Sequence, residues 1–146
     1  MIFRDYQEKD FINLKEMMLS LQREDPAEMP MNETKIKRTV NESLIHPEKI
    51  RIIILCMDVA IAGYSILVFY WSNEHGGNII NIDELYVRKE YRGKQIASNF
   101  IKHLITKYRG AVSLQLETTP SNEGATRLYK RLGFIDSPNH HMVLRL

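Results

Sequence analysis

The sequence predicts an α/β domain of the α+β kind: a mixed, mostly antiparallel sheet of six to seven strands with about four helices on both faces. Its length of 146 residues is that of one ordinary domain. Four segments with helical apolar spacing are separated by runs rich in β-branched residues. A strand, helix, strand crossover near 80–117 requires one parallel pair. No repeat or linker divides the chain, so 1–146 is expected to be a single domain.

The first third of the chain is predicted to hold a strand and two helices. The opening run, Ile2 to Tyr6, favours a strand. A helix that ends before Pro26 follows, because apolar residues recur three and four positions apart at Phe11, Leu14, Met18 and Leu21. A second helix is expected to begin after Asn32, a favourable N-cap, because apolar residues repeat at spacing four at Ile36, Val40 and Leu44.

The middle of the chain is predicted to form a meander of antiparallel strands. Strands are expected near Ile50 to Met57, Ala60 to Tyr70 and Ile79 to Val87. The apolar stretch 52–71 is also long enough to cross a bilayer as a helix. Asp58 within it is a natural turn residue, and its β-branched and aromatic residues prefer a pleated surface. Two buried strands are therefore favoured over a membrane span.

The last third is predicted to alternate between helices and strands. A third helix begins near Gln95 and stops at Gly110. Val112 to Glu117 is expected to be a strand, and Asn122 begins a fourth helix that ends at Gly133. The final segment, His141 to Leu146, is expected to close the sheet as a last strand.

Charge and cysteine content limit the classes of partner. The single cysteine, Cys56, cannot form an internal disulfide, which favours a reducing, cytoplasmic setting. The net charge of +2 falls short of that usual in nucleic-acid binders. Residues 1–73 carry 9 basic and 11 acidic side chains, whereas residues 74–146 carry 11 and 7. An anionic ligand should therefore prefer the second half of the chain.

One segment of that half has the features of an anion site. Residues 86–97 join a strand end to a helix start and hold four basic residues against Glu90 alone: Arg88, Lys89, Arg92 and Lys94. The first turn of a helix has unpaired N–H groups and a positive dipole end, so a diphosphate could be held there. A solvated basic turn is the alternative.

Two motifs carry a resemblance to a known family. The run Arg92-Gly93-Lys94-Gln95-Ile96-Ala97 resembles the phosphate-binding motif of the GNAT superfamily of acetyl-CoA-dependent N-acetyltransferases. The later segment 122–134 is similar to a second motif of that superfamily, with its Asn, Ala, Leu-Tyr and Gly-Phe at Asn122, Ala125, Leu128, Tyr129, Gly133 and Phe134. One departure is present, since Gln95 stands where the family usually has a glycine.

The resemblance implies acetyl-CoA as co-substrate, no metal, and a role for each matching position. The main chain of Leu85, Tyr86 and Val87 would pair with the pantetheine arm. Arg92 and Lys94 would lie beside the pyrophosphate, which would be held by the N–H groups of Gly93, Lys94, Gln95, Ile96, Ala97 and Ser98. Asn122 would contact the pantetheine or acyl end, and Tyr129 would lie near the sulfur.

Acetyl transfer needs a base and a proton donor. An amine like that of lysine, with a pKa near 10.4, is neutral in only about one molecule in 2,500 at pH 7. Adjacent carboxylates at Asp83 and Glu84 should lie on opposite faces of their strand, and whichever lines the cleft can accept the proton. The Tyr129 hydroxyl can protonate the departing thiolate, although a helix tyrosine could equally be a core aromatic.

These features predict an acetyl-CoA-dependent N-acetyltransferase that acts on a primary amine of a small molecule by direct attack. Alternatives are a protein or peptide N-acetyltransferase, a non-catalytic acyl-CoA-binding module and a nucleic-acid binder. No metal is expected, because His75, His140 and His141 lack ligand partners at metal-binding spacing. Neither a nucleic acid nor a membrane is an expected partner, and a homodimer is an open alternative to a monomer.

Overall fold

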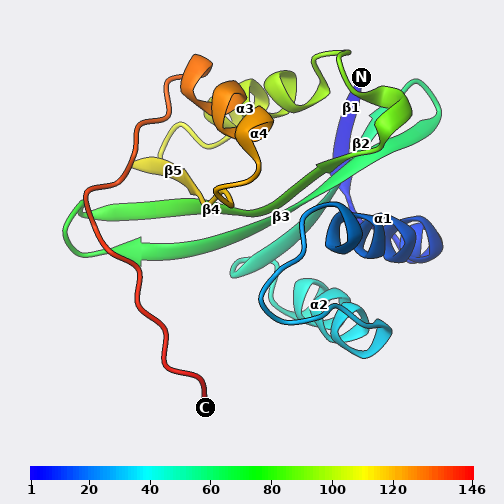
Figure 1. The fold of residues 1–146 in the computed structure, drawn as a ribbon, viewed down its shortest axis with the longest axis horizontal. Helices are drawn as coiled ribbons and strands as arrows, with labels where there is room; N and C mark the ends of the chain where they lie inside the picture. The colour runs from blue at the N-terminus through cyan, green and yellow to red at the C-terminus, as the bar shows by residue number, and fades with distance from the viewer.

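Five strands form one sheet in the computed structural model, which describes residues 1–146 (Figure 1). Their spatial order follows the chain: β1 (Ile2–Asp5), β2 (Ile50–Met57), β3 (Ala60–Ser72), β4 (Gly77–Val87) and β5 (Ser113–Leu116). Neighbours from β1 to β4 are antiparallel, and β4 pairs with β5 in parallel. The predicted mixed, mostly antiparallel sheet, with a strand, helix, strand crossover near 80–117, is confirmed.

Four α-helices accompany the sheet, as predicted. They are α1 (Phe11–Glu24), α2 (Glu33–Ile45), α3 (Ile96–Lys107) and α4 (Glu123–Arg131). Short 3₁₀ turns precede α1 and α3, at Glu8–Asp10 and Lys89–Tyr91. The expected cap of α2 is present, because the Asn32 side chain accepts a hydrogen bond from the Lys35 N–H at 2.9 Å.

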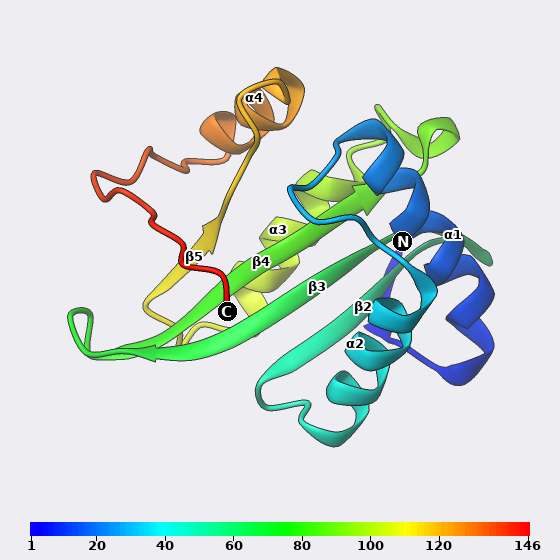
Figure 2. The ribbon, with the colours of Figure 1, turned by 60° about the horizontal axis from the view of Figure 1, so that its bottom comes forward.

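The helices cover both faces of the sheet, with α1 and α2 on one side and α3 and α4 on the other (Figures 1 and 2). Alternate strand residues therefore enter two separate cores. On the α1–α2 side, Tyr64 and Ile66 pack with Leu14. On the α3–α4 side, Leu67 and Phe100 belong to the second core.

The number of strands was predicted wrongly, because the sheet has five strands rather than six to seven. His141 to Leu146 joins no ladder; its hydrophobic residues are exposed, and the tail leaves the sheet in Figure 1. The tail touches the rest of the chain through ion pairs of Arg145 with Glu28 and of His141 with Glu117. Apolar pattern reports strand propensity, but a strand exists only where a neighbouring backbone supplies hydrogen bonds.

The fold also decides whether residues 52–71 form two strands or a membrane-spanning helix. Residues 52–71 form most of β2 and β3, and Asp58 lies in the turn between them with φ of 54°. None of the helices combines the length and the apolar character that crossing a bilayer would need.

Candidate active site

The second half of β4 has a free edge. The ladder between β4 and β5 ends at the pair Ile82 and Leu116, whereas pairing with β3 continues to Val87. Figure 2 shows β5 leading away from β4 toward α4. From Asp83 to Val87 the backbone on the β5 side therefore has no strand partner. A chain with its own amide groups could pair along this edge.

A β-bulge opens this half of the strand. Ile66 of β3 faces Glu84, and the next residue of β3, Leu67, faces Ile82, so Asp83 has no counterpart. The bulge interrupts the regular alternation of side chains at this point. Regular strand geometry therefore no longer supports the prediction that Asp83 and Glu84 lie on opposite faces of the sheet.

Glu84 has the environment of a general base. The hydroxyl of Tyr64, which is fully buried, donates to Glu84 Oε2 at 2.6 Å. Burial raises the pKa of Glu84 above its ordinary value; the Tyr64 hydrogen bond opposes this shift, and the charge of Asp83 adds to it. A half-buried carboxylate with a raised pKa accepts protons more readily than a solvated one.

Asp83 is the more solvent-exposed of the two carboxylates. The surrounding protein still partly desolvates it, and together with the charge of Glu117 this raises its pKa. Between the two carboxylates, Glu84 is the stronger candidate for the base, because only Glu84 is oriented by a side-chain hydrogen bond.

The loop after β4, residues 88–95, is called here the basic loop, and it lies against the end of α1. Arg92 Nε donates to the carbonyl of Val87 at 2.9 Å, and its Nη2 lies 2.5 Å from Glu24 Oε2. The same guanidinium stacks over the Tyr86 ring at 5.6 Å. Lys94 extends over the ring of Tyr91, 5.0 Å from its centre.

The start of α3 has the backbone of an anion-binding turn. Gly93 has φ of 77° and Gln95, the N-cap, has φ of 60°, both in the left-handed region. No side chain caps this helix start, so the N–H groups of its first turn are available to a ligand. Ile96 directs its side chain into the core and offers only its backbone, while Ala97 and Ser98 are half-buried.

The two predicted residues of α4 have different surroundings. Asn122 caps the helix by accepting from the Ala125 N–H at 3.2 Å, and its Nδ2 donates to Asp25 Oδ2 at 3.1 Å. Tyr129 packs against the α3–α4 core, with its ring 5.6 Å from that of Phe134. Burial raises the pKa of Tyr129 to about 12, so its hydroxyl is protonated at neutral pH.

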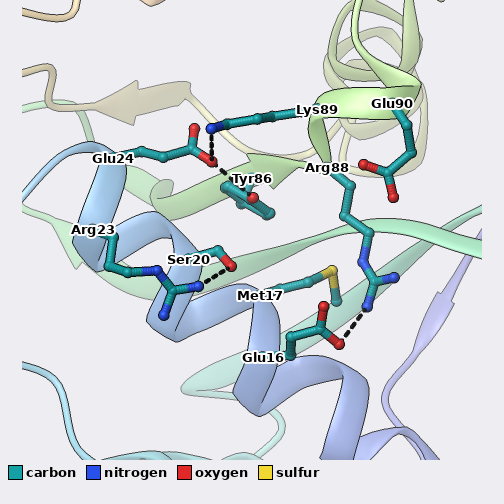
Figure 3. A pocket seen from close by; sticks show the side chains of 9 residues that line it. All are labelled: Glu16, Met17, Ser20, Arg23, Glu24, Tyr86, Arg88, Lys89 and Glu90. Atoms are coloured by element: carbon teal, nitrogen blue, oxygen red, sulfur yellow. Dashed lines mark hydrogen bonds and ion pairs between the residues drawn. The ribbon is translucent and has the colours of Figure 1, made fainter.

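A pocket of about 360 Å³ lies between α1 and the end of β4 (Figure 3). Its lining is mostly charged, with Glu16, Arg23, Glu24, Arg88, Lys89 and Glu90 around Met17, Ser20 and Tyr86. The Tyr86 hydroxyl donates to Glu24 Oε1 at 3.1 Å, and Arg88 pairs with Glu16 at 3.3 Å. The pocket therefore adjoins the basic loop, which contributes Arg88, Lys89 and Glu90 to its lining.

Sequence reasoning missed Tyr64, Glu24 and Asp25. Tyr64 is one of several aromatic residues in an apolar run, and only the pairing of β3 with β4 places it beside Glu84. A signal for the other two was present: acidic residues at the C-terminal end of a helix oppose its dipole. Such a placement indicates that their favourable partners lie elsewhere in the fold.

Comparison with known proteins defines the family. Residues 14–134 match the model of the acetyltransferase (GNAT) family, and this chain belongs to that family. A thialysine N-epsilon-acetyltransferase from Bos taurus is 36% identical over 78 residues, which cover 52% of this chain and 45% of the relative. The porcine protein of the same name, from Sus scrofa, is 36% identical over 76 residues, covering 51% and 44%. The match thus spans under half the length of these relatives.

Solved structures show the same fold. A structure described as a possible acetyltransferase from Clostridium difficile 630 superposes with a TM-score of 0.84 at 20% identity, covering 99% of this chain and 97% of that one. A ribosomal-protein-alanine N-acetyltransferase from Brucella melitensis biovar Abortus 2308 gives 0.74 at 19% identity, with both chains fully covered.

Proposed function

We propose that this chain is an acetyl-CoA-dependent N-acetyltransferase that transfers the acetyl group to a primary amine of a small molecule. The observation that carries the proposal is the free edge of β4 between Asp83 and Val87. This edge includes the desolvated carboxylate of Glu84, and the loop that follows it leads to the uncapped start of α3. Family membership implies acetyl-CoA as the donor. No metal is part of the proposal.

The backbone groups of β4 and of the start of α3 suit acetyl-CoA, which is an extended molecule with an anionic diphosphate. Between Leu85 and Val87, the backbone groups that do not face β3 are available to the amides of a pantetheine arm, except the Val87 carbonyl, which accepts from Arg92 Nε. The first-turn N–H groups of α3 are available to the pyrophosphate. Arg92 and Lys94 lie on the same loop and would add positive charge.

Glu84 is proposed to prepare the attacking amine. The ammonium loses one proton to the Glu84 carboxylate, directly or through a water, and the neutral nitrogen forms a bond with the thioester carbon. A backbone N–H between Leu85 and Val87 donates to the oxyanion that develops. The carbon–sulfur bond then breaks, and the nitrogen releases its second proton as the amide forms.

Tyr129 is proposed to act at the sulfur. Because its pKa is about 12 and that of a thiol is near 8.5, complete transfer of its proton to the thiolate is uphill. Its hydroxyl therefore acts as a hydrogen-bond donor that stabilises the departing thiolate, which takes its proton finally from solvent. Asn122 is proposed to contact the pantetheine or acyl end.

The names of the relatives favour a small amine as acceptor. Thialysine N-epsilon-acetyltransferases share 36% identity over about half of this chain. The second candidate is a protein N-terminus, because a ribosomal-protein-alanine N-acetyltransferase shares the fold. A non-catalytic acyl-CoA-binding module is the third. The cytoplasmic location, the absence of nucleic-acid and membrane partners, and the open alternative of a homodimer stay predictions.

Two measurements test this function. A ligand at a hundred times its dissociation constant adds about 2.7 kcal/mol to the free energy of unfolding, so millimolar acetyl-CoA is expected to raise the melting temperature by several degrees. A panel of small amines and peptides is then screened for thiol release that requires acetyl-CoA. Release with a small amine supports the proposal, release with peptides alone supports the second candidate, and binding without any release supports the third.

A further inference from the structure

Two consecutive carboxylates at the end of α1 contact both walls of the proposed acetyl-CoA site. Glu24 is the last residue of α1 and Asp25 is its C-cap. Both stand at the negative end of the helix dipole, where an anion is unfavourable. Their favourable partners come instead from the loop after β4 and from the start of α4.

Glu24 pairs with two of the four cations of the basic loop, Arg92 and Lys89. Its carboxylate lies 2.5 Å from Arg92 Nη2 and 3.8 Å from Lys89 Nζ, and it accepts from the Tyr86 hydroxyl at 3.1 Å. Only 25% of the Glu24 side chain is exposed. Burial alone would raise the pKa of Glu24, but the hydrogen bonds from Arg92 and Tyr86 outweigh it and lower the pKa. Glu24 is therefore a carboxylate at neutral pH.

Asp25 contacts the residues at and just before the start of α4. It accepts from the Thr119 hydroxyl at 2.8 Å and from Asn122 Nδ2 at 3.1 Å. Thr119 lies between β5 and α4, and Asn122 is the N-cap of α4. The end of α1 is thus tied to both sides at once.

We propose that Glu24 and Asp25 form a clasp over the site, in which Glu24 occupies Arg92 until the diphosphate of CoA displaces it. The proposal rests on the acetyl-CoA binding proposed above. A diphosphate and the Glu24 carboxylate compete for the same Arg92 guanidinium, and their like charges repel each other when both lie beside it. Displacement of Glu24 loosens the start of the 25–32 segment between α1 and α2.

Calorimetric titration with CoA tests the clasp. Glu24→Gln keeps the size of the side chain and removes the charge that competes for Arg92, so CoA is expected to bind about fivefold to tenfold more tightly than to the unaltered protein. The matched control is Glu16→Gln, which removes a carboxylate of the same pocket that pairs with Arg88 instead of Arg92. Glu16→Gln is expected to change the affinity by less than about twofold.

A second ligand separates competition at Arg92 from a general change in the site. Pantetheine lacks the diphosphate, so its affinity is expected to be equal for Glu24→Gln and the unaltered protein. Equal or weaker CoA binding by Glu24→Gln, or an equal gain with Glu16→Gln, overturns the clasp while CoA binding itself stands. Failure of the unaltered protein and of Glu24→Gln to bind CoA at all overturns the proposed function as well.

Discussion

The two halves of β4 differ in what lies along their edges. From Gly77 to Ile82 the strand pairs with β3 on one edge, and most of that length pairs with β5 on the other. Ile79, Ile80 and Ile82 in this half are at most 3% exposed. From Asp83 to Val87 only β3 remains as a partner, and the side chains include two carboxylates with raised pKa values.

One strand thus supplies both a paired, buried half and a half with a free edge. Backbone groups along an unpaired edge are satisfied by water or by a ligand. Because the paired half anchors the strand, the free half keeps its position without a second neighbour. The change occurs at the Asp83 bulge, where the register with β3 shifts and the ladder with β5 ends. Of the variants below, Glu84→Gln alters the free half itself and Gly63→Ala alters its pairing with β3. Tyr129→Phe and Gln95→Gly alter α4 and the start of α3.

The largest expected effect is that of Glu84→Gln on acetyl transfer. Glutamine cannot accept the amine proton, so kcat/KM at neutral pH is expected to fall by about 10² to 10⁴. Activity should recover as alkaline solution deprotonates the amine without assistance. In the unaltered protein the acidic limb of the pH–rate profile should lie above 4.5, since burial raises the pKa of Glu84 above that ordinary value. If Glu84→Gln retains this acidic limb, the limb reports the titration of another group, and Asp83→Asn is the next variant to test.

The same variant has the opposite effect on stability. Because the pKa of Glu84 is raised in the folded protein, its protonated form favours folding, and this contribution is lost as the pH rises through the folded pKa. Glu84→Gln avoids burying the charge, so it is expected to raise the melting temperature at pH 7 but not below pH 4.5. Equal gains at both pH values would show that charge burial is not the cause.

Tyr129→Phe is expected to have the next largest effect. The ring and its packing against Phe134 are kept while the hydroxyl is lost, so the melting temperature and CoA affinity should hardly change. Loss of the donor to the departing thiolate should lower turnover by about 10² to 10³. Full turnover in single-turnover experiments where acetyl transfer limits the rate would make Tyr129 a structural residue.

Gly63→Ala tests the pairing that supports the free half. A Cβ at Gly63 would lie 2.2 Å from the carbonyl oxygen of Tyr86, and a backbone atom within a sheet cannot move aside cheaply. We expect a loss of about 1 to 3 kcal/mol in the free energy of unfolding, measured with urea. The control is Gly110→Ala, whose Cβ would have no atom within 4 Å. Equal stability of the two variants would mean that β3 and β4 separate there at little cost.

The smallest expected effect is that of Gln95→Gly. Gln95 has φ of 60°, a left-handed conformation that costs a side-chain residue about 1 kcal/mol and a glycine nothing. The variant is expected to gain about 1 kcal/mol in stability and to bind CoA more tightly. Gln95→Ala keeps the strain and should show no such gain in stability. Weaker CoA binding by Gln95→Gly would identify the glutamine side chain as a contact to the phosphates.

Most of the elements could be predicted from the sequence because their signals are local. Apolar spacing and caps placed α1 to α4, and the strand Ile50–Met57 was predicted with its observed bounds. The left-handed turn at the start of α3 explains why a glycine is usual at the position of Gln95. The tail at His141 to Leu146 had the pattern of a strand but no partner, so the same kind of signal failed there.

The sequence by itself determined the order of the elements, the basic start of α3 and the motif residues of α4, because each depends on residues a few positions apart. Only the tertiary structure decided that Tyr64 donates to Glu84, that a bulge falls at Asp83, and that Glu24 and Asp25 join the end of α1 to Arg92 and to Asn122. These contacts join residues 20 to 97 positions apart. Strand pairing and chain reversal bring such residues together, and a bulge such as that at Asp83 leaves no mark in the local apolar pattern.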